Sequence, residues 1–93
     1  MLNGKTAIIT GASRGIGKQI LIKFAESKAN IIACSNKESS ELLNYYKELE
    51  NKENIKIKPY FFDFNLEDQS KEFAKKISSE NDNIDILVNN AGE

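Results

Sequence analysis

Histidine and tryptophan are absent from this 93-residue sequence, and cysteine, methionine and proline each occur only once. Without histidine, the chain lacks the commonest general base and the commonest side-chain ligand for metals. The single cysteine, Cys34, excludes a disulfide within the chain and a cysteine-rich zinc site. We therefore expect no metal centre, and a reducing, cytoplasmic environment is the simplest interpretation.

Long hydrophobic runs and blocks of one charge are also missing. The first apolar stretch ends at Thr10, so it is too short for a secretory signal and for a membrane span. The formal net charge is −1 and the lysines are spread along the chain, which gives no reason to expect nucleic acid or an acidic membrane as partner. With 40% hydrophobic and 29% charged residues, the composition is that of one small globular domain.

Hydrophobic periodicity predicts strands and helices in strict alternation. Short apolar or β-rich runs predict strands at residues 7–9, 30–34, 55–64 and 84–88. Apolar residues at helical spacing predict helices at residues 16–28, 37–51 and 67–80. This β-α-β-α-β-α-β order predicts an α/β fold with a parallel sheet and helices on both faces. Pro59 indicates an edge strand or an irregularity, and Asp85 is expected to face solvent.

The most informative stretch is TGASRGIG at residues 10–17, between the first predicted strand and the first predicted helix. Glycines let a phosphate approach the backbone closely, and the N–H groups that begin a helix favour an anion. The glycine spacing is G-x-x-x-G-x-G, not the commoner G-x-G-x-x-G. A P-loop is disfavoured because Ala12 and Gln19 occupy two of its fixed positions. A structural turn that binds nothing is the other alternative.

Three motifs together resemble the short-chain dehydrogenase/reductase family: residues 10–17, Asp63 at the end of the third strand, and NNAG at residues 89–92. The three motifs occur in the same order along the chain as in the family, from the first strand to the last residue. Within the family the chain is most similar to the 3-oxoacyl-[acyl-carrier-protein] reductases of fatty-acid synthesis, on stretches that many relatives share. The resemblance implies a Rossmann-like half-domain over residues 1–93, with strand order 3-2-1-4.

The resemblance also assigns residues to a dinucleotide cofactor. In the glycine turn, the phosphates would be held by Gly11, Ala12, Ser13, Arg14, Gly15, Ile16 and Gly17. After the later strands, the adenine would meet Asp63 and Phe64, and the ribose and nicotinamide side would meet Asn89, Asn90, Ala91 and Gly92. Two alternatives stay open, since a carboxylate at a strand end can cap the next turn and the asparagines can fix the sheet.

The residues after the second strand favour NADP(H) over NAD(H). NAD-binding folds usually place an acid there to hold the ribose 2′-hydroxyl, but no acid occurs in this chain before Glu38. Arg14 and Lys37 would instead supply positive charge to a 2′-phosphate, with hydrogen bonds from Ser35 and Asn36.

Two structural alternatives compete with these assignments. Arg14 can be a solvated surface residue, and Ser35 with Glu38 fits the S-x-x-E pattern of a capping box for the second helix.

The family resemblance implies that the chemistry lies elsewhere. Its members use a serine, a tyrosine as general acid and a lysine four residues after that tyrosine, all beyond the asparagine-glycine motif. Tyr45, Tyr46 and Tyr60 lack such a lysine, so we expect them to be packing residues. We predict no catalytic residue in this chain, only the cofactor-binding N-terminal fragment of an NADP(H)-dependent reductase.

Alternatives to that fragment are a non-catalytic dinucleotide-binding module and a truncated product without function. The parent enzyme is implied to be a homotetramer, and a complementing chain is one possible partner of the fragment.

Overall fold

The computed structural model describes residues 1–62, 67–81 and 83–89. Within these residues the chain forms, in order, β1 (Thr6–Thr10), α1 (Gly15–Glu26), β2 (Asn30–Ser35), α2 (Ser40–Glu53), β3 (Ile57–Phe61), α3 (Glu67–Glu80) and β4 (Ile86–Val88). The predicted alternation of strands and helices is confirmed. The boundaries differ most at α2, which begins three residues later than residue 37, and at β3 and β4, which are shorter than predicted.

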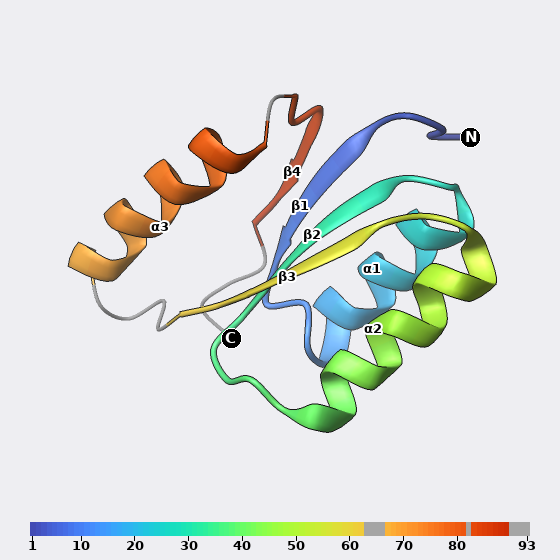
Figure 1. Cartoon of the computed structure of the whole chain (residues 1–93), viewed down its shortest axis with the longest axis horizontal. Helices are drawn as coiled ribbons and strands as arrows, with labels where there is room; N and C mark the ends of the chain where they lie inside the picture. The colour runs from blue at the N-terminus through green and yellow to red at the C-terminus, as the bar shows by residue number, and fades with distance from the viewer. Residues whose placement is uncertain (63–66, 82, 90–93) are drawn as a thin grey trace.

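The four described strands form one parallel sheet in the order β3-β2-β1-β4, as the family resemblance implies. Helices α1 and α2 cover one face of the sheet and α3 covers the other (Figure 1). Strand β3 lies at an edge of the sheet, where Pro59 pairs with Ala33. This position suits a residue without a backbone N–H, because an edge strand needs hydrogen bonds on one side only.

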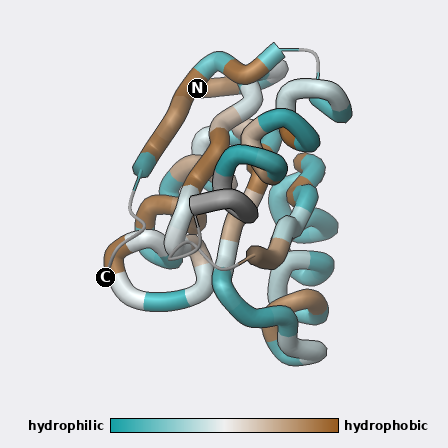
Figure 2. The backbone as a smooth tube through the Cα atoms, turned by 90° about the vertical axis from the view of Figure 1, so that its left-hand side faces the viewer, coloured by the Kyte–Doolittle hydropathy of each residue, from teal (hydrophilic) through white to brown (hydrophobic). Residues whose placement is uncertain are grey.

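Two hydrophobic clusters hold the layers together, one on each face of the sheet. Hydrophobic residues concentrate in the strands, whereas the helices carry many hydrophilic residues (Figure 2). On the α1 and α2 face, Ile9, Leu21 and Ile31 are at most 1% exposed. On the α3 face, Ile32 and Cys34 of β2 pack with Tyr60 and Ile77. Strand β2 is therefore buried on both faces, which explains its continuous apolar sequence.

The predicted capping box is wrong. Ser39 is the N-cap of α2, and its Oγ accepts a hydrogen bond from the backbone N–H of Leu42 at 3.1 Å. Ser35 continues β2 instead, pairs with Phe61, and is only 2% exposed. A side chain that is buried in a strand cannot cap a helix that begins five residues later, so the S-x-x-E pattern has no role at that position.

Two polar contacts join elements that are far apart in the sequence. Lys28 follows α1, and its Nζ donates to the Oε1 of Glu53 at 2.9 Å and to the carbonyl oxygen of Glu53 at 3.0 Å. Asp85 is exposed as predicted, but its N–H also donates to Thr6 O and its Oδ2 accepts from Thr6 N, both at 2.9 Å. These contacts fix the C-terminal ends of α1 and α2 and the start of the β1–β4 pairing.

No helix within the described residues is long and apolar enough to cross a membrane.

Candidate cofactor-binding site

The glycine turn leaves the carboxyl end of β1 and enters α1. Gly11 has a φ of 65° and Gly15 a φ of 59°, both in the left-handed region that glycine adopts readily. Ala12 is fully buried, and its N–H donates to the carbonyl oxygen of Cys34 at 3.1 Å. The two glycines bend the turn, and Ala12 ties it to the end of β2.

The N-terminus of α1 is exposed at this turn. Its N-cap residue, Arg14, is extended, and among the described residues no side chain caps the helix. The first turn of α1 also contains no acidic residue, whereas α2 has the Ser39 cap and Glu41. Because the partial positive charge of a helix N-terminus favours an anion, α1 and not α2 is equipped to receive a phosphate.

The structure places the predicted residues of the glycine turn in two environments. Arg14, Gly15 and Ile16 are exposed. Gly11 and Ser13 are half-buried, and Ala12 and Gly17 are buried. The exposed group surrounds the helix N-terminus, while the buried residues support the turn from beneath.

The residues after β2 are divided in the same way. Asn36 and Lys37 are exposed, whereas Ser35 is buried against the α2 side of the sheet. Since Thr10 of β1 pairs with Cys34 of β2, the segments that follow these strands leave the sheet side by side. The structure therefore brings Arg14, Asn36 and Lys37 to one edge, but it does not present the Ser35 hydroxyl there.

The end of β4 is held by a residue to which the sequence reasoning gave no role. Thr10 Oγ1 lies 3.1 Å from Asn89 Oδ1 and 3.4 Å from the carbonyl oxygen of Val88, and it donates to them. Asn89 itself is exposed. Thr10 ends β1 immediately before the glycine turn. Its hydroxyl at a strand end is the feature of the sequence that could have indicated this contact with the end of β4.

Five other predicted residues lie outside the described part of the chain: Asp63, Phe64, Asn90, Ala91 and Gly92.

A pocket of about 420 Å³ opens between α3 and the sheet near the carboxyl ends of the strands. Thr10, Cys34, Phe62 and Asn89 are among its lining residues, so it borders the same edge as the glycine turn. Phe62 stacks on Phe73 of α3 with ring centroids 3.7 Å apart. Burial raises the pKa of the Cys34 thiol to about 12, which keeps this side chain neutral. The pocket therefore offers a largely apolar, uncharged wall.

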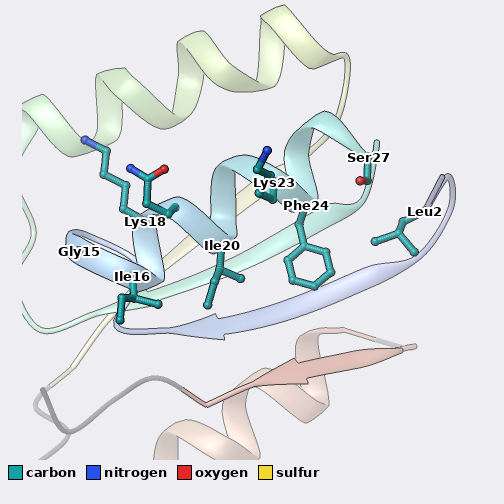
Figure 3. Close-up of a pocket in the computed structure, with 9 residues that line it drawn as sticks. Leu2, Gly15, Ile16, Lys18, Ile20, Lys23, Phe24 and Ser27 are labelled. Carbon is teal, nitrogen blue, oxygen red and sulfur yellow. The ribbon is translucent and has the colours of Figure 1, made fainter.

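A larger groove of about 630 Å³ runs along α1 from Gly15 to Ser27. Ile16, Ile20 and Phe24 project from one face of α1, with Leu2 beside Phe24 (Figure 3). Ile16 is 64% exposed. These apolar side chains cannot donate hydrogen bonds to an anion, but the groove is also lined by the donors Lys18, Gln19, Lys23 and Ser27, so its lining is mixed.

The tyrosines have packing environments. Tyr46 is 2% exposed and Tyr60 is 7% exposed, and Tyr45 is half-buried. Tyr60 OH donates to Glu80 Oε1 at 2.7 Å and accepts from Asn81 Nδ2 at 3.3 Å, which joins β3 to the end of α3. This burial agrees with the prediction that the tyrosines are packing residues. Within the described residues, no three histidine, cysteine or acidic side chains form a group that could hold a metal ion.

Comparisons with known proteins agree with the fold. The 2-dehydro-3-deoxy-D-gluconate 5-dehydrogenase of Pseudoalteromonas atlantica is 42% identical over 94 residues, which cover 98% of this chain and 35% of that protein. A 3-oxoacyl-[acyl-carrier-protein] reductase of Thermotoga maritima is 41% identical over 92 residues, which cover 98% of this chain and 36% of the reductase. The chain thus spans about a third of the length of these relatives.

A solved structure supports the same relationship. L-sorbose reductase from Gluconobacter frateurii, in complex with NADPH and L-sorbose, superposes with a TM-score of 0.84 at 30% identity. The superposition covers 99% of this chain and 35% of the reductase. The family model of the short chain dehydrogenases matches residues 5–93, nearly the whole sequence. This chain therefore belongs to the short-chain dehydrogenase family, of which it represents the NAD(P)-binding N-terminal region.

Proposed function

We propose that this chain binds NADP(H) and is the cofactor-binding part of an NADP(H)-dependent carbonyl reductase or alcohol dehydrogenase. The observation that carries the proposal is the N-terminus of α1, which has no side-chain cap among the described residues and lies beside the exposed Arg14. A helix N-terminus in this state binds a pyrophosphate, and the adjacent guanidinium adds a charge for a second phosphate.

Different residues of the chain would bind different parts of the cofactor. The backbone of the turn from Gly11 to Gly17 would hold the pyrophosphate, while Arg14, Asn36 and Lys37 would surround the 2′-phosphate. Asn89, held by Thr10, would lie toward the ribose and nicotinamide end. The bound nicotinamide would supply or accept a hydride; these residues bind and orient it and move no proton.

Two solved relatives support NADP(H) over NAD(H). The L-sorbose reductase was crystallised with NADPH, and an alcohol dehydrogenase from Thermococcus sibiricus with 5-hydroxy-NADP. The second superposes with a TM-score of 0.77 at 27% identity and covers 89% of this chain. In this chain, no acid stands between Cys34 and Lys37 to repel a 2′-phosphate.

The proposal for the whole enzyme extends to its substrate. A 3-oxoacyl-[acyl-carrier-protein] reductase of fatty-acid synthesis is supported by 41% identity, but the 2-dehydro-3-deoxy-D-gluconate 5-dehydrogenase is 42% identical and human retinol dehydrogenase 13 is 40% identical. A non-catalytic dinucleotide-binding module and a truncated product without function are the alternatives. A cytoplasmic location and a homotetrameric parent enzyme stay predictions.

Calorimetric titration with NADPH and NADH, after circular dichroism has shown that the chain is folded, tests the proposal. We expect saturable binding with NADPH preferred, and a loss of roughly tenfold in NADPH affinity for Arg14→Ala with little change for NADH. Lys52→Ala is the matched control, because it removes the same charge from the exposed last turn of α2. A folded chain that binds neither nucleotide would exclude the dinucleotide-binding module, and an unfolded chain would favour the truncated product.

A further inference from the structure

The two edges of the sheet differ in whether they can accept another strand. Strand β3 forms one edge, and it carries the exposed Lys58 and also Pro59, which has no N–H to donate. A charged residue and a proline are features that keep an edge strand from pairing. Within the described residues, β4 forms the other edge, and its sequence Ile86–Val88 is apolar and has neither feature. The structure therefore leaves the β4 edge open to a further strand.

On the α3 face, the apolar surface beside β4 is uncovered. Leu87 of β4 is 67% exposed, and Ile84, just before this strand, is 36% exposed. Both residues line the pocket of about 420 Å³ between α3 and the sheet, together with the buried Ile77 of α3. Apolar side chains that are this exposed leave area in water that a packed neighbour would remove.

On the opposite face, the groove of about 630 Å³ along α1 lies beside the same edge. Ile16, Ile20 and Phe24 project from α1 away from α2, toward the side of β1 on which β4 lies (Figure 3). Lys18 and Lys23 also line this groove, and among the described residues no acidic side chain does. The β4 edge is thus flanked by an uncovered apolar surface on each face of the sheet.

The size of the relatives indicates what kind of partner fits this edge. The L-sorbose reductase superposes on 99% of this chain, but the shared part is only 35% of the reductase. The greater part of that enzyme has no counterpart among these residues and must pack against the shared part. Uncovered apolar surface marks such contact sites, and a parallel sheet carries helices on both faces. A strand beside β4 with a helix over each face matches the open edge and both apolar surfaces.

We propose that the β4 edge and the apolar residues beside it form a docking surface for the C-terminal part of a short-chain dehydrogenase, present as a second polypeptide. This polypeptide would add a parallel strand to β4 and place an apolar helix over each face of the sheet. We call the docking surface the β4 surface; its apolar residues are Ile84 and Leu87 on one face and Ile16, Ile20 and Phe24 on the other. The proposal concerns assembly and goes beyond the binding of a nucleotide.

Co-expression of the 93-residue chain with the C-terminal part of the Thermotoga maritima reductase, beyond the matched residues, tests the proposal. We expect a complex of one copy of each polypeptide in size-exclusion chromatography with light scattering, in the absence of nucleotide. The corresponding part of the Pseudoalteromonas atlantica dehydrogenase provides a second partner for the same measurement. The absence of a complex with both partners would overturn the proposal.

Leu87→Asp tests whether β4 is the point of contact. The complex should dissociate with a Kd about tenfold higher or more, because a carboxylate would be buried at the interface. The isolated variant should unfold at the wild-type urea concentration, since Leu87 is 67% exposed in the chain alone. Lys58→Asp is the matched control, because it places the same residue at an exposed position of the opposite edge strand. Equal affinities of the two variants for the partner would overturn the assignment to β4.

Charge reversal tests the face that α1 forms. Because Lys18 and Lys23 line the groove without an acidic neighbour there, we expect the helix that covers it to carry acidic side chains. Lys23→Glu should therefore weaken the complex by roughly 2- to 5-fold, the range of an exposed ion pair. Lys47→Glu makes the same change at an exposed position of α2, outside the groove, and should leave the affinity unchanged. An unchanged affinity in Lys23→Glu would contradict an acidic helix over α1.

The same chromatography on the isolated chain separates the proposed partner from a second copy. A monomer that forms the complex with the C-terminal polypeptide would support the proposal. A dimer of the chain alone that Leu87→Asp dissociates would assign the β4 surface to a second copy and would overturn the proposal. Because assembly is measured without nucleotide, a chain that binds no NADPH would refute the proposed function and would leave the docking result standing.

Discussion

Replacement of Gly15 by alanine tests whether the glycine turn is a phosphate site, and Gly4 provides the matched comparison. Gly15 has a φ of 59° at the start of α1, and Gly4 has a φ of 78° before β1. A Cβ on Gly4 would meet no other described atom within 4 Å. In the folded state, the left-handed backbone alone disfavours alanine by about 1–2 kcal/mol. Alanine also lowers the conformational entropy of the unfolded chain, which stabilises the folded state by about 0.4–1 kcal/mol.

Both variants should therefore lose roughly 1 kcal/mol of stability. For a domain of about this size, that loss lowers the midpoint of thermal unfolding by about 4–8 °C, which circular dichroism can measure. The two variants should differ in their affinity for NADPH. A Cβ on Gly15 would stand where the backbone must approach the pyrophosphate, so NADPH affinity should fall roughly tenfold or more, while Gly4→Ala keeps wild-type affinity. Equal NADPH affinity in the two variants would refute the assignment of this turn to the phosphates.

Four further predictions concern stability and the reactivity of Cys34. Ser39→Ala should lower the free energy of unfolding, measured with urea, by about 1 kcal/mol, because the hydrogen-bond acceptor for Leu42 N is lost. Ser39→Asp keeps an acceptor at this position and should retain most of the wild-type stability. Cys34, with its pKa near 12, should not react with a thiol reagent at pH 8 until the chain unfolds. From pH 9 to 12 the unfolded state loses this proton first, so stability should fall with rising pH, and it should fall less in Cys34→Ala. Tyr45, Tyr46 and Tyr60, whose pKa values are also raised by burial, titrate in the same direction. Glu53→Gln should lower the free energy of unfolding by about 1 kcal/mol, because the ion pair with Lys28 is lost. The difference between variant and wild type should shrink in 1 M salt, where the Debye length is about 3 Å. A salt-independent difference would contradict that ion-pair origin.

The fold could be predicted well because its signals are local. Apolar runs and helical spacing identify each strand and helix within a few residues, and residues 67–80 match α3 at both ends. The start of α2 was misplaced because apolar spacing does not fix the first turn of a helix, and the capping-box alternative for Ser35 and Glu38 was wrong because local sequence does not reveal that β2 continues to Ser35. That extension depends on pairing with β3, which is a tertiary contact.

The candidate site was predictable only in part. The glycine turn is one continuous stretch, so its shape follows from Gly11 and Gly15 themselves. The contact of Thr10 with Asn89 joins residues 79 positions apart, and it forms only because β1 and β4 are neighbours in the sheet. No local pattern marks such a pair.

Sequence alone determined the order of the elements, the glycine turn that we propose as the phosphate site and the missing acid after β2, because each depends on residues close together in the chain. Tertiary structure decided which side chains are available at that edge. Ser35 and Lys37 are two residues apart, yet packing of α2 on the sheet buries the first, and the second stays exposed. Ser35 is the last residue of β2 and lies under α2, whereas Lys37 follows the strand in the exposed segment before α2, so the end of the strand and the helix that covers it decide which side chain can meet a ligand.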